Sequence, residues 1–448
     1  MSQNAGGVLQ QESGVTGEHV KVAFASLIGT AIEWYDFFLY GTAAALVFNK
    51  LFFPQFDPMV GTIAAFATFS IGFIARPFGG MVFGHYGDRI GRKRMLYLTL
   101  LIMGVGTTLV GLLPTYESIG IWAPILLVTC RLLQGFALGG EWGGAVLMAV
   151  EHAPENRRGF YGSWPQLGAP LGLVLGTIVF GYFARYPEKE FLSWAWRVPF
   201  LFSVLLVGVG LFIRMRIAES PAFEKIKQAK MESKMPIIEA IKKHPKNLLL
   251  AMGVRFAENG LFYIYAAFVF AYATGVLKVD RPTILTAVTI AASIEVFTIP
   301  LFGLLSDKIG RRPVYMFGAV FSGLWAFPFF WIMGYKDPWL TTLGVAVGLA
   351  VGHAAMYGPQ ASFLSEMFSA RVRYSGASLG YQLASIFAGA LTPLVATSLL
   401  AYYGNQFWPV AVYMMILALI TVVSLYFAAE TYQQTNEETF EATAPKIA

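Results

Sequence analysis

The chain has 448 residues, of which 56% are hydrophobic and only 13% are charged, with a formal net charge of +6. A water-soluble protein of this length would need far more charge to cover its surface, so these values exclude a soluble globular protein. Apolar stretches of about 20 residues recur along the whole chain, and each is long enough to cross a bilayer core as a helix. The sequence therefore predicts an all-α membrane protein.

Turn and charge signals divide the apolar stretches into twelve predicted transmembrane helices. Their approximate limits are 22–49, 58–83, 93–114, 122–150, 159–184, 193–215, 247–276, 282–303, 313–335, 338–366, 373–402 and 407–429. The loops that follow the even-numbered spans hold 20 Lys and Arg residues, whereas the loops on the opposite side hold six. Because positive residues stay on the cytoplasmic side, we expect both termini to be cytoplasmic. Basic residues in such loops report orientation and do not indicate a nucleic-acid partner.

A polar segment, 214–246, divides the chain into two predicted six-helix bundles, 1–213 and 247–448, the second with a short acidic tail. Within it, "KMPIIEAIKKH" predicts a short amphipathic helix on the membrane surface. The halves repeat one another: "GHYGDRIGRKR" at 84–94 is echoed by "GLLSDKIGRRP" at 303–313, and "DFFLYGTAAALVF" from Asp36 by "ENGLFYIYAAFVF" from Glu258. Two related halves of six spans are typical of a transporter.

The repeated loop at 84–94 resembles the signature of the major facilitator superfamily. Further stretches resemble its metabolite:proton symporters, which include permeases for shikimate, α-ketoglutarate and proline or betaine. These stretches are "EWYDFFLY" (33–40), "RPFGG" (76–80), "RLLQGFALGGEWGG" (131–144), "WRVPF" (196–200) and "ESPAF" (219–223). The resemblance implies the major facilitator fold and proton-driven uptake across a bacterial inner membrane, with two bundles rocking about a central site.

Glu33 and Asp36 lie three residues apart inside the first span, where ionisable side chains are rare and usually functional. The resemblance to proton-coupled symporters, in which a span-one acid faces a span-four arginine, makes Asp36 with Arg131 the predicted proton-coupling pair. Glu33 is the second candidate. Gly135, Gly139 and Gly143 recur every four residues after Arg131 and predict close approach of another helix, without a ligand role.

Other polar side chains inside the spans are candidates for substrate binding. Arg76 either lines a central cavity and attracts a carboxylate or extends to the membrane interface. Arg255 and Glu258 form either an internal ion pair or a pair in which a substrate carboxylate competes for the arginine. The complete candidate set is Arg76, Tyr40, Gln134, Glu141, Gln166, Arg255, Glu258, Asn259, Tyr263, Tyr357 and Tyr381. Glu295 and His353 are interpreted as packing hydrogen bonds.

The two signature loops predict a conformational latch. Asp88 and Asp307 can accept hydrogen bonds from backbone amides at a helix N-terminus. Arg92 and Arg311 can pair with the acids that end spans four and ten, Glu151 and Glu366. The latch prediction comprises these six residues and Gly84.

These observations favour a secondary transporter that imports a small organic acid, such as a shikimate-like carboxylate, together with protons. A zwitterion such as proline or betaine, and a proton-driven efflux antiporter, are the alternatives. No phosphate loop, metal cluster or nucleophile motif supports an enzyme, a metal or a cofactor. We expect a monomer in the lipid bilayer of the bacterial inner membrane, with a small-molecule substrate and protons as its partners.

Overall fold

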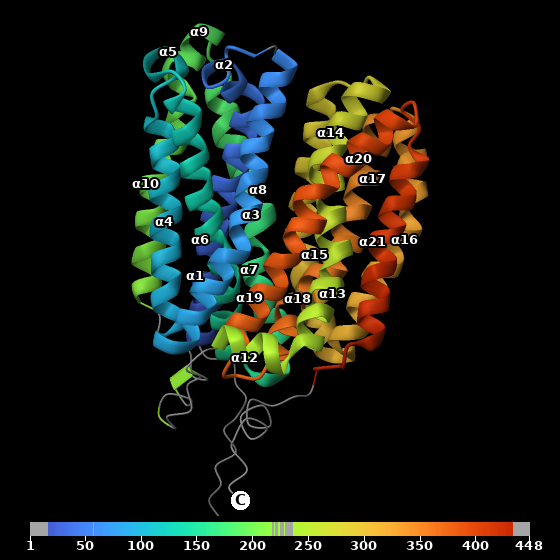
Figure 1. Ribbon diagram of the computed structural model, residues 1–448. Helices are drawn as coiled ribbons and strands as arrows, with labels where there is room; N and C mark the ends of the chain where they lie inside the picture. The colour runs from blue at the N-terminus through green and yellow to red at the C-terminus, as the bar shows by residue number, and fades with distance from the viewer. Residues whose placement is uncertain are drawn as a thin grey trace, which may run out of the picture.

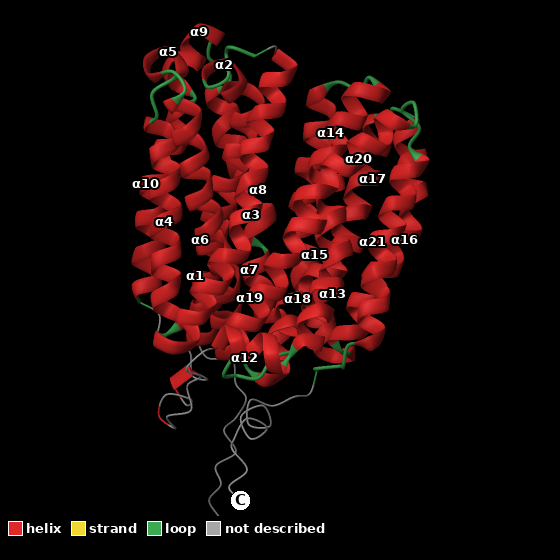
Figure 2. Ribbon diagram, viewed as in Figure 1, coloured by secondary structure: helices red, strands yellow, loops and turns green. Residues whose placement is uncertain are grey.

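A computed structural model of the chain describes residues 17–56, 58–216, 219, 223–224, 228 and 236–432. The described part is almost entirely helical and contains no β-strand, as Figure 2 shows. The predicted all-α class is therefore confirmed. Most of the predicted loop 214–246, the end of the chain after residue 432 and three residues of the "ESPAF" stretch lie outside the described residues.

The first half of the chain forms the long helices of six predicted spans and three short helices between them. These are α1 (Gly17–Ala43), α2 (Asn49–Leu51), α3 (Pro58–Ile90), α4 (Arg92–Leu112), α5 (Tyr116–Ile119), α6 (Trp122–His152), α7 (Arg158–Gln166), α8 (Gly168–Phe183), α9 (Glu188–Glu190) and α10 (Arg197–Met215). The predicted span 159–184 is broken between α7 and α8 at Leu167, next to two prolines, Pro165 and Pro170. Proline lacks a backbone N–H and cannot complete the helical ladder, which explains this interruption.

The second half begins with the short helix α12 (Pro236–Lys243), which lies within the predicted amphipathic stretch and packs against α3 and α19. Its other helices are α13 (Pro245–Tyr263), α14 (Val269–Ala271), α15 (Arg281–Ile309), α16 (Arg311–Gly334), α17 (Pro338–Val347), α18 (Ala354–Glu366), α19 (Arg373–Ala384), α20 (Leu391–Tyr402) and α21 (Trp408–Phe427). Wider π-helical turns join several of them, among them Ile264–Phe268, Gly348–His353 and Ser385–Ala390. Such turns occur frequently at functional sites.

Eleven helical stretches of the described residues are long and apolar enough to cross a membrane. The predicted span 58–83 lies in α3, which is not one of these eleven. With 33 residues, α3 is nevertheless about 50 Å long and exceeds the thickness of a bilayer core. Each of the twelve predicted spans thus corresponds to one long helix or to a run of consecutive helical segments.

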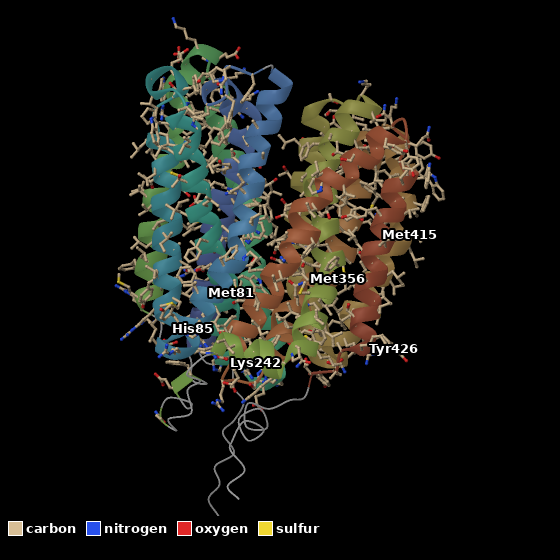
Figure 3. All side chains as sticks on the ribbon, in the orientation of Figure 1. Met81, His85, Lys242, Met356, Met415 and Tyr426 are labelled. Atoms are coloured by element: carbon tan, nitrogen blue, oxygen red, sulfur yellow. The ribbon has the colours of Figure 1, made fainter. Side chains whose placement is uncertain are left out.

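Figure 1 shows α1–α10 in blue to green beside α13–α21 in yellow to red, with α12 at the lower end. We call this lower end the basic end, because the repeated loops 84–94 and 303–313 lie there. Figure 3 places His85, Lys242 and Tyr426 at or near this end. Helices α3, α6, α7 and α8 of the first half contact α15, α18 and α19 of the second half.

Helices α3 and α6 approach each other closely through glycines. A Cβ atom at Gly135 would lie 2.1 Å from the carbonyl oxygen of Gly72, and one at Gly139 would lie 1.9 Å from that of Arg76. This confirms the predicted close approach at these two positions. Gly143, the third glycine of the series, faces the other half of the molecule, because a Cβ there would lie 1.9 Å from Ser378 Oγ in α19.

Gly139→Val should destabilise the folded protein, because the new side chain collides with the α3 backbone and cannot be accommodated by a rotamer change. We expect the free energy of unfolding to fall by about 1–3 kcal/mol. Thermal unfolding of the purified protein in detergent measures this effect. Gly208→Val in α10 is the matched control, since no atom lies within 4 Å of a Cβ at Gly208. Equal melting temperatures for the two variants would contradict the packing role of Gly139.

Candidate functional site

Asp36 is fully buried in α1 and its carboxylate is held by two hydroxyl groups. Ser203 Oγ of α10 donates to Oδ1 over 2.6 Å, and Thr107 Oγ1 of α4 donates to Oδ2 over 2.8 Å. Among the described residues, no Lys, Arg or His nitrogen lies within 4 Å of this carboxylate. Hydroxyl groups stabilise a carboxylate less than a paired cation does, so burial here favours the neutral acid.

Arg131 does not contact Asp36 in this conformation, so their predicted partnership, which the conformational change is expected to make and break, stays a prediction. Its guanidinium carbon lies 4.4–4.9 Å from the ring centres of Phe37, Tyr40 and Phe69. Its Nη1 donates over 3.5 Å to Gln134 Oε1, and Gln134 Nε2 donates over 2.8 Å to Thr107 Oγ1, the group that holds Asp36.

Hydroxyl groups of α4 and α10 thus surround the Asp36 carboxyl group, and a chain of hydrogen bonds through Thr107 and Gln134 connects it to Arg131. Tyr40, a predicted binding residue, shares a 2.8 Å hydrogen bond with Thr68 beneath the Arg131 guanidinium.

Glu33 and Glu141 belong to a separate cluster around Arg214, inside the first bundle. Arg214 Nη2 forms a short ion pair with Glu141 Oε1 and lies 4.0 Å from Glu33 Oε1. Thr99 Oγ1 also donates to Glu141 over 2.5 Å. These partners come from α1, α4 and α10, so Glu141 points away from the second bundle, as does Gln134. Arg214, which the charge pattern assigns to the loop, is instead a buried residue of α10.

A group of polar side chains joins the two bundles near the middle of the interface. Arg255 Nε lies 3.2 Å from Glu258 Oε2 within α13, and its guanidinium lies 3.2 Å from the ring centre of Tyr381 in α19. The Tyr381 ring stacks on Trp142 of α6, in the other bundle, with ring centres 3.6 Å apart. The predicted Arg255–Glu258 pair is therefore present, and through Tyr381 it contacts the first bundle.

Gln166 closes this connection from the end of α7. Its Oε1 accepts from Trp142 Nε1 over 2.8 Å, and its Nε2 lies 3.3 Å from both Gln360 Oε1 and the carbonyl oxygen of Tyr357 in α18. Gln360 Nε2 in turn donates to Glu258 Oε2 over 2.9 Å. A ring of contacts therefore runs from Glu258 through Arg255, both bundles and back to Glu258.

A second group at the interface contains buried polar atoms without a hydrogen-bond partner in the described structure. They are Nε and Nη2 of Arg76, Oδ1 of Asn259 and the hydroxyl of Tyr263. The Arg76 guanidinium lies over the Phe73 ring, 4.0 Å from its centre, and that ring packs against Tyr263 with centres 5.7 Å apart. A Cβ at Gly389 would lie 2.5 Å from Asn259 Oδ1, so only glycine lets this side chain pack so closely against α19 and the turn that follows it. Arg76 is 3% exposed and does not extend to the membrane interface.

The two predicted latch aspartates each cap a helix of the opposite bundle. Asp88 accepts from the backbone nitrogens of Tyr374 and Ser375 at the start of α19, over 3.3 and 2.9 Å. Asp307 accepts from Gly159 and Phe160 at the start of α7, over 2.7 and 2.8 Å. The predicted contacts with helix N-termini are therefore present in both copies.

The predicted arginine–glutamate contacts are present as well. Arg92 forms a short ion pair with Glu151 and lies 3.7 Å from Asp88. Glu151 also binds Arg373 of the other bundle over 3.1 Å. In the second copy, Arg311 lies 2.5 Å from Asp307 and 3.4 Å from Glu366. Gly84 lets α3 approach α19, because a Cβ there would lie 2.9 Å from the Cα atom of Ser375.

Several residues of the site do not follow from the sequence pattern. Trp142 and Gln360 complete the ring of contacts, and Thr107 and Ser203 hold Asp36. Gln360 is a polar side chain within an apolar span, and this signal could have identified it. Threonine and serine are common in membrane helices, where they usually bond to their own backbone, so the sequence does not single out Thr107 or Ser203.

Two halves with the same loop signature, whose polar side chains meet where the halves join, define a polytopic membrane transporter. Comparison with known proteins agrees with this class. The sequence model of the Major Facilitator Superfamily matches residues 26–377 and, in a second alignment, residues 248–448. The chain therefore belongs to the major facilitator superfamily.

Several bacterial transporters are similar to this chain over almost its whole length. The shikimate transporter of Escherichia coli (strain K12) is 43% identical over 408 residues, which cover 90% of this chain and 93% of that protein. The inner membrane metabolite transport protein YhjE of the same organism is 41% identical and covers 95% of this chain and 97% of its own length. The proline/betaine transporter of that organism is 36% identical, with coverages of 93% and 84%.

A solved structure of the proton:xylose symporter XylE bound to 6-bromo-6-deoxy-D-glucose shares the fold, with a TM-score of 0.76 at 16% identity, over 95% of this chain and 99% of that one. Together, these findings confirm the predicted family and fold. The chain is a transporter of small molecules and not an enzyme.

Asp88→Asn should loosen the contact between the bundles at the basic end, because the variant loses the charge that attracts two backbone N–H groups and Arg92. Labelling of a cysteine at Ser378, in a Cys130→Ser background, measures access to this contact. Ser378 is fully buried beneath Gly143. We expect labelling by a water-soluble maleimide to become about tenfold faster, which corresponds to the loss of one charge-assisted hydrogen bond.

Asp337→Asn is the matched control for this experiment. Asp337 also accepts two backbone N–H bonds, from Trp339 and Leu340, but it caps α17 at the opposite end of the molecule and stays within its own bundle. In the Asp337→Asn variant, the cysteine at position 378 should be labelled at the same rate as in the parent protein. An unchanged rate in Asp88→Asn would indicate that Asp88 does not hold the bundles together.

Proposed function

We propose that this transporter takes up a small organic acid, such as a shikimate-like carboxylate, together with protons. The observation that carries the proposal is the buried Arg76 guanidinium, which has no carboxylate partner among the described residues, with the polar side chains of Asn259 and Tyr263 close by. A guanidinium without a carboxylate in a dry interface is costly, and a bound anion would remove that cost. The 43% identity to a shikimate transporter supports a carboxylate-bearing substrate.

In this proposal the other predicted binding residues surround the anion. Arg255 and Tyr381 lie on the second bundle, Gln166 is contributed by the first, and Tyr357 lies next to Gln166. Tyr40 stays with Arg131. Gln134 and Glu141 point into the first bundle and are assigned to the chain of polar groups there.

Asp36 is proposed to carry the proton, with Arg131 as its partner in a second conformation. In the described arrangement Asp36 has only hydroxyl partners, which favours its neutral form. A rearrangement that brings Asp36 to Arg131 would favour the carboxylate and release the proton. Gln134 bridges the two groups and would be displaced when they pair. Glu33, which shares Arg214 with Glu141, is the second candidate.

The basic end is proposed to face the cytoplasm of a bacterial cell, with the carrier as a monomer in the inner membrane. The contacts of Asp88, Asp307 and Arg373 would then hold the cytoplasmic side closed while the site faces outward, and their release would open the site inward. This cycle is an alternating-access mechanism.

A zwitterionic substrate is the second candidate. It is favoured by the 36% identity to a proline/betaine transporter and by the aromatic rings around Arg131 and Arg255. Uptake of shikimate and of betaine into the same proteoliposomes separates the two. Efflux by exchange for protons is a different mechanism, and it would remove substrate from energised vesicles instead of accumulating it.

Asp36→Asn should abolish uphill transport while it preserves exchange. The amide imitates the protonated acid, so the variant still binds substrate but has no proton to release. In proteoliposomes with an imposed pH gradient, the parent protein should concentrate radiolabelled shikimate and Asp36→Asn should not. Counterflow exchange of labelled for unlabelled shikimate should persist in the variant.

Glu33→Gln serves as the comparison and should keep part of the gradient-driven uptake. Accumulation of shikimate by Asp36→Asn in response to the pH gradient would assign the coupling role elsewhere, with Glu33 as the next candidate. Failure of the parent protein to transport shikimate or betaine would reject both proposed substrate classes.

Reporter fusions test the proposed orientation. Fusions at residues 230 and 448 should both report a cytoplasmic location, because the basic loops and both chain termini are predicted to lie on that side. A fusion within 184–188 supplies the control and should report the periplasm. A periplasmic signal from residue 230 or 448 would reject the orientation.

A further inference from the structure

Three ionisable side chains lie in a row inside the second bundle, next to the proposed binding site. His353 is the central member, at the end of a π-helical turn. Its Nδ1 makes a short contact with Glu295 Oε1 of α15, and its Nε2 lies 3.4 Å from Glu258 Oε1 of α13. All three are at most 2% exposed. We call Glu295, His353 and Glu258 the triad.

The geometry of the triad requires an additional proton. A neutral imidazole carries one N–H, so it can donate to one of the two carboxylates but not to both. With both ring nitrogens facing carboxylate oxygens, either the imidazole is doubly protonated or one carboxyl group carries the proton. The three side chains and Arg255 then have no net charge together, whereas loss of that proton would leave a net charge of −1 in a dry interior.

We propose that the triad is a second proton-binding site of this transporter, in the bundle opposite Asp36, and that its proton controls Arg255. Transfer of a proton from His353 Nε2 to Glu258 Oε1 converts the imidazolium to imidazole and the carboxylate to a carboxylic acid. Glu258 then no longer holds Arg255 as an ion pair, and Arg255 becomes available to an anion. When a carboxylate binds there, one proton from the medium restores the imidazolium and keeps the site neutral.

Among the described residues, Arg255 is the only Lys or Arg that forms an ion pair with the triad. Tyr315 of α16 and Tyr357 of α18 are neutral groups beside it: Tyr315 OH shares Gln360 Nε2 with Glu258, and the Tyr357 ring lies 4.8 Å from His353. The centre of the Phe262 ring lies 5.1 Å from that of the His353 ring. Tyr381 lies beside Arg255 and shares a hydrogen bond with Tyr357. The imidazole lies between the two carboxylates, so the three groups do not converge as metal ligands would.

Nuclear magnetic resonance of histidine-labelled protein tests the proton site without any substrate. The chain has five histidines. The imidazole signal that is missing from the spectrum of His353→Gln is assigned to His353. At pH 7.5 an ordinary imidazole is about nine-tenths neutral. We expect His353 to be doubly protonated at this pH and Glu295→Gln to lower its doubly protonated fraction by about tenfold. Glu117→Gln, an exposed acid of α5, is the control and should leave the signal unchanged.

Infrared spectroscopy of the same samples covers the case in which a carboxyl group holds the proton. The protein would then show a carboxylic-acid band that disappears in Glu258→Gln or Glu295→Gln. A singly protonated His353 together with no such band would overturn the proposal. Asp36→Asn is the reference for the infrared spectra, because a protonated Asp36 would give a carboxylic-acid band of its own. Two variants, Glu258→Gln and Glu295→Gln, are compared, so the band can still be assigned if one of them is unstable.

Shikimate binding in weakly buffered detergent solution tests the link to Arg255, which rests on the proposed function. In Asp36→Asn we expect uptake of about one proton per bound shikimate, and loss of this uptake when His353→Gln is added. Equal proton uptake in both variants would reject the link. If no shikimate binds to any variant, the proposed substrate class fails, and the histidine titration still decides the proton site.

Discussion

A charged side chain removed from water is stable only when another group compensates its charge. Both bundles contain many such side chains, and the structure compensates them in three ways. Arg214 and Glu141 pair within one bundle, Asp88 and Asp307 bind backbone N–H groups of the opposite bundle, and Asp36 accepts from two hydroxyls. Because the second kind exists only while the bundles meet, electrostatic compensation and the position of the bundles depend on each other.

Some of the buried polar atoms that lack a partner lie where the two halves join. Arg76, Asn259 and Tyr263 come from α3 and α13, and the absence of a side chain at Gly389 lets Asn259 and Tyr263 pack directly against its backbone. Arg255 differs from Arg76 because it has its own carboxylate, Glu258. In the described conformation one arginine therefore has no carboxylate partner, whereas the other is paired with an internal carboxylate. In the proposed function the first arginine would attract an anion and the second would bind it only after Glu258 releases it.

The sequence predicts the helical fold well because a membrane span must bury its backbone polar groups in helices of a minimum length. It also predicts the contacts of Asp88, Arg92, Asp307 and Arg311, since two copies of a loop under the same symmetry constrain each other. It fails where side-chain direction decides. The sequence does not show that hydroxyl groups of two other helices hold the Asp36 carboxylate in this conformation, or that Arg214, at the edge of the predicted loop, is buried.

The exchange of helix caps between the bundles has a consequence for hydration. Separation of the basic end frees four backbone N–H groups, those of Gly159, Phe160, Tyr374 and Ser375, and two carboxylates at the same moment. The carboxylates keep Arg92 and Arg311 of their own bundles as partners, but the freed N–H groups would be hydrated, so in the proposed cycle each opening event would draw solvent molecules into the gap. The equilibrium between closed and open forms therefore depends on the activity of water next to the membrane, and concentrated solutes that are excluded from the gap shift it toward the closed form.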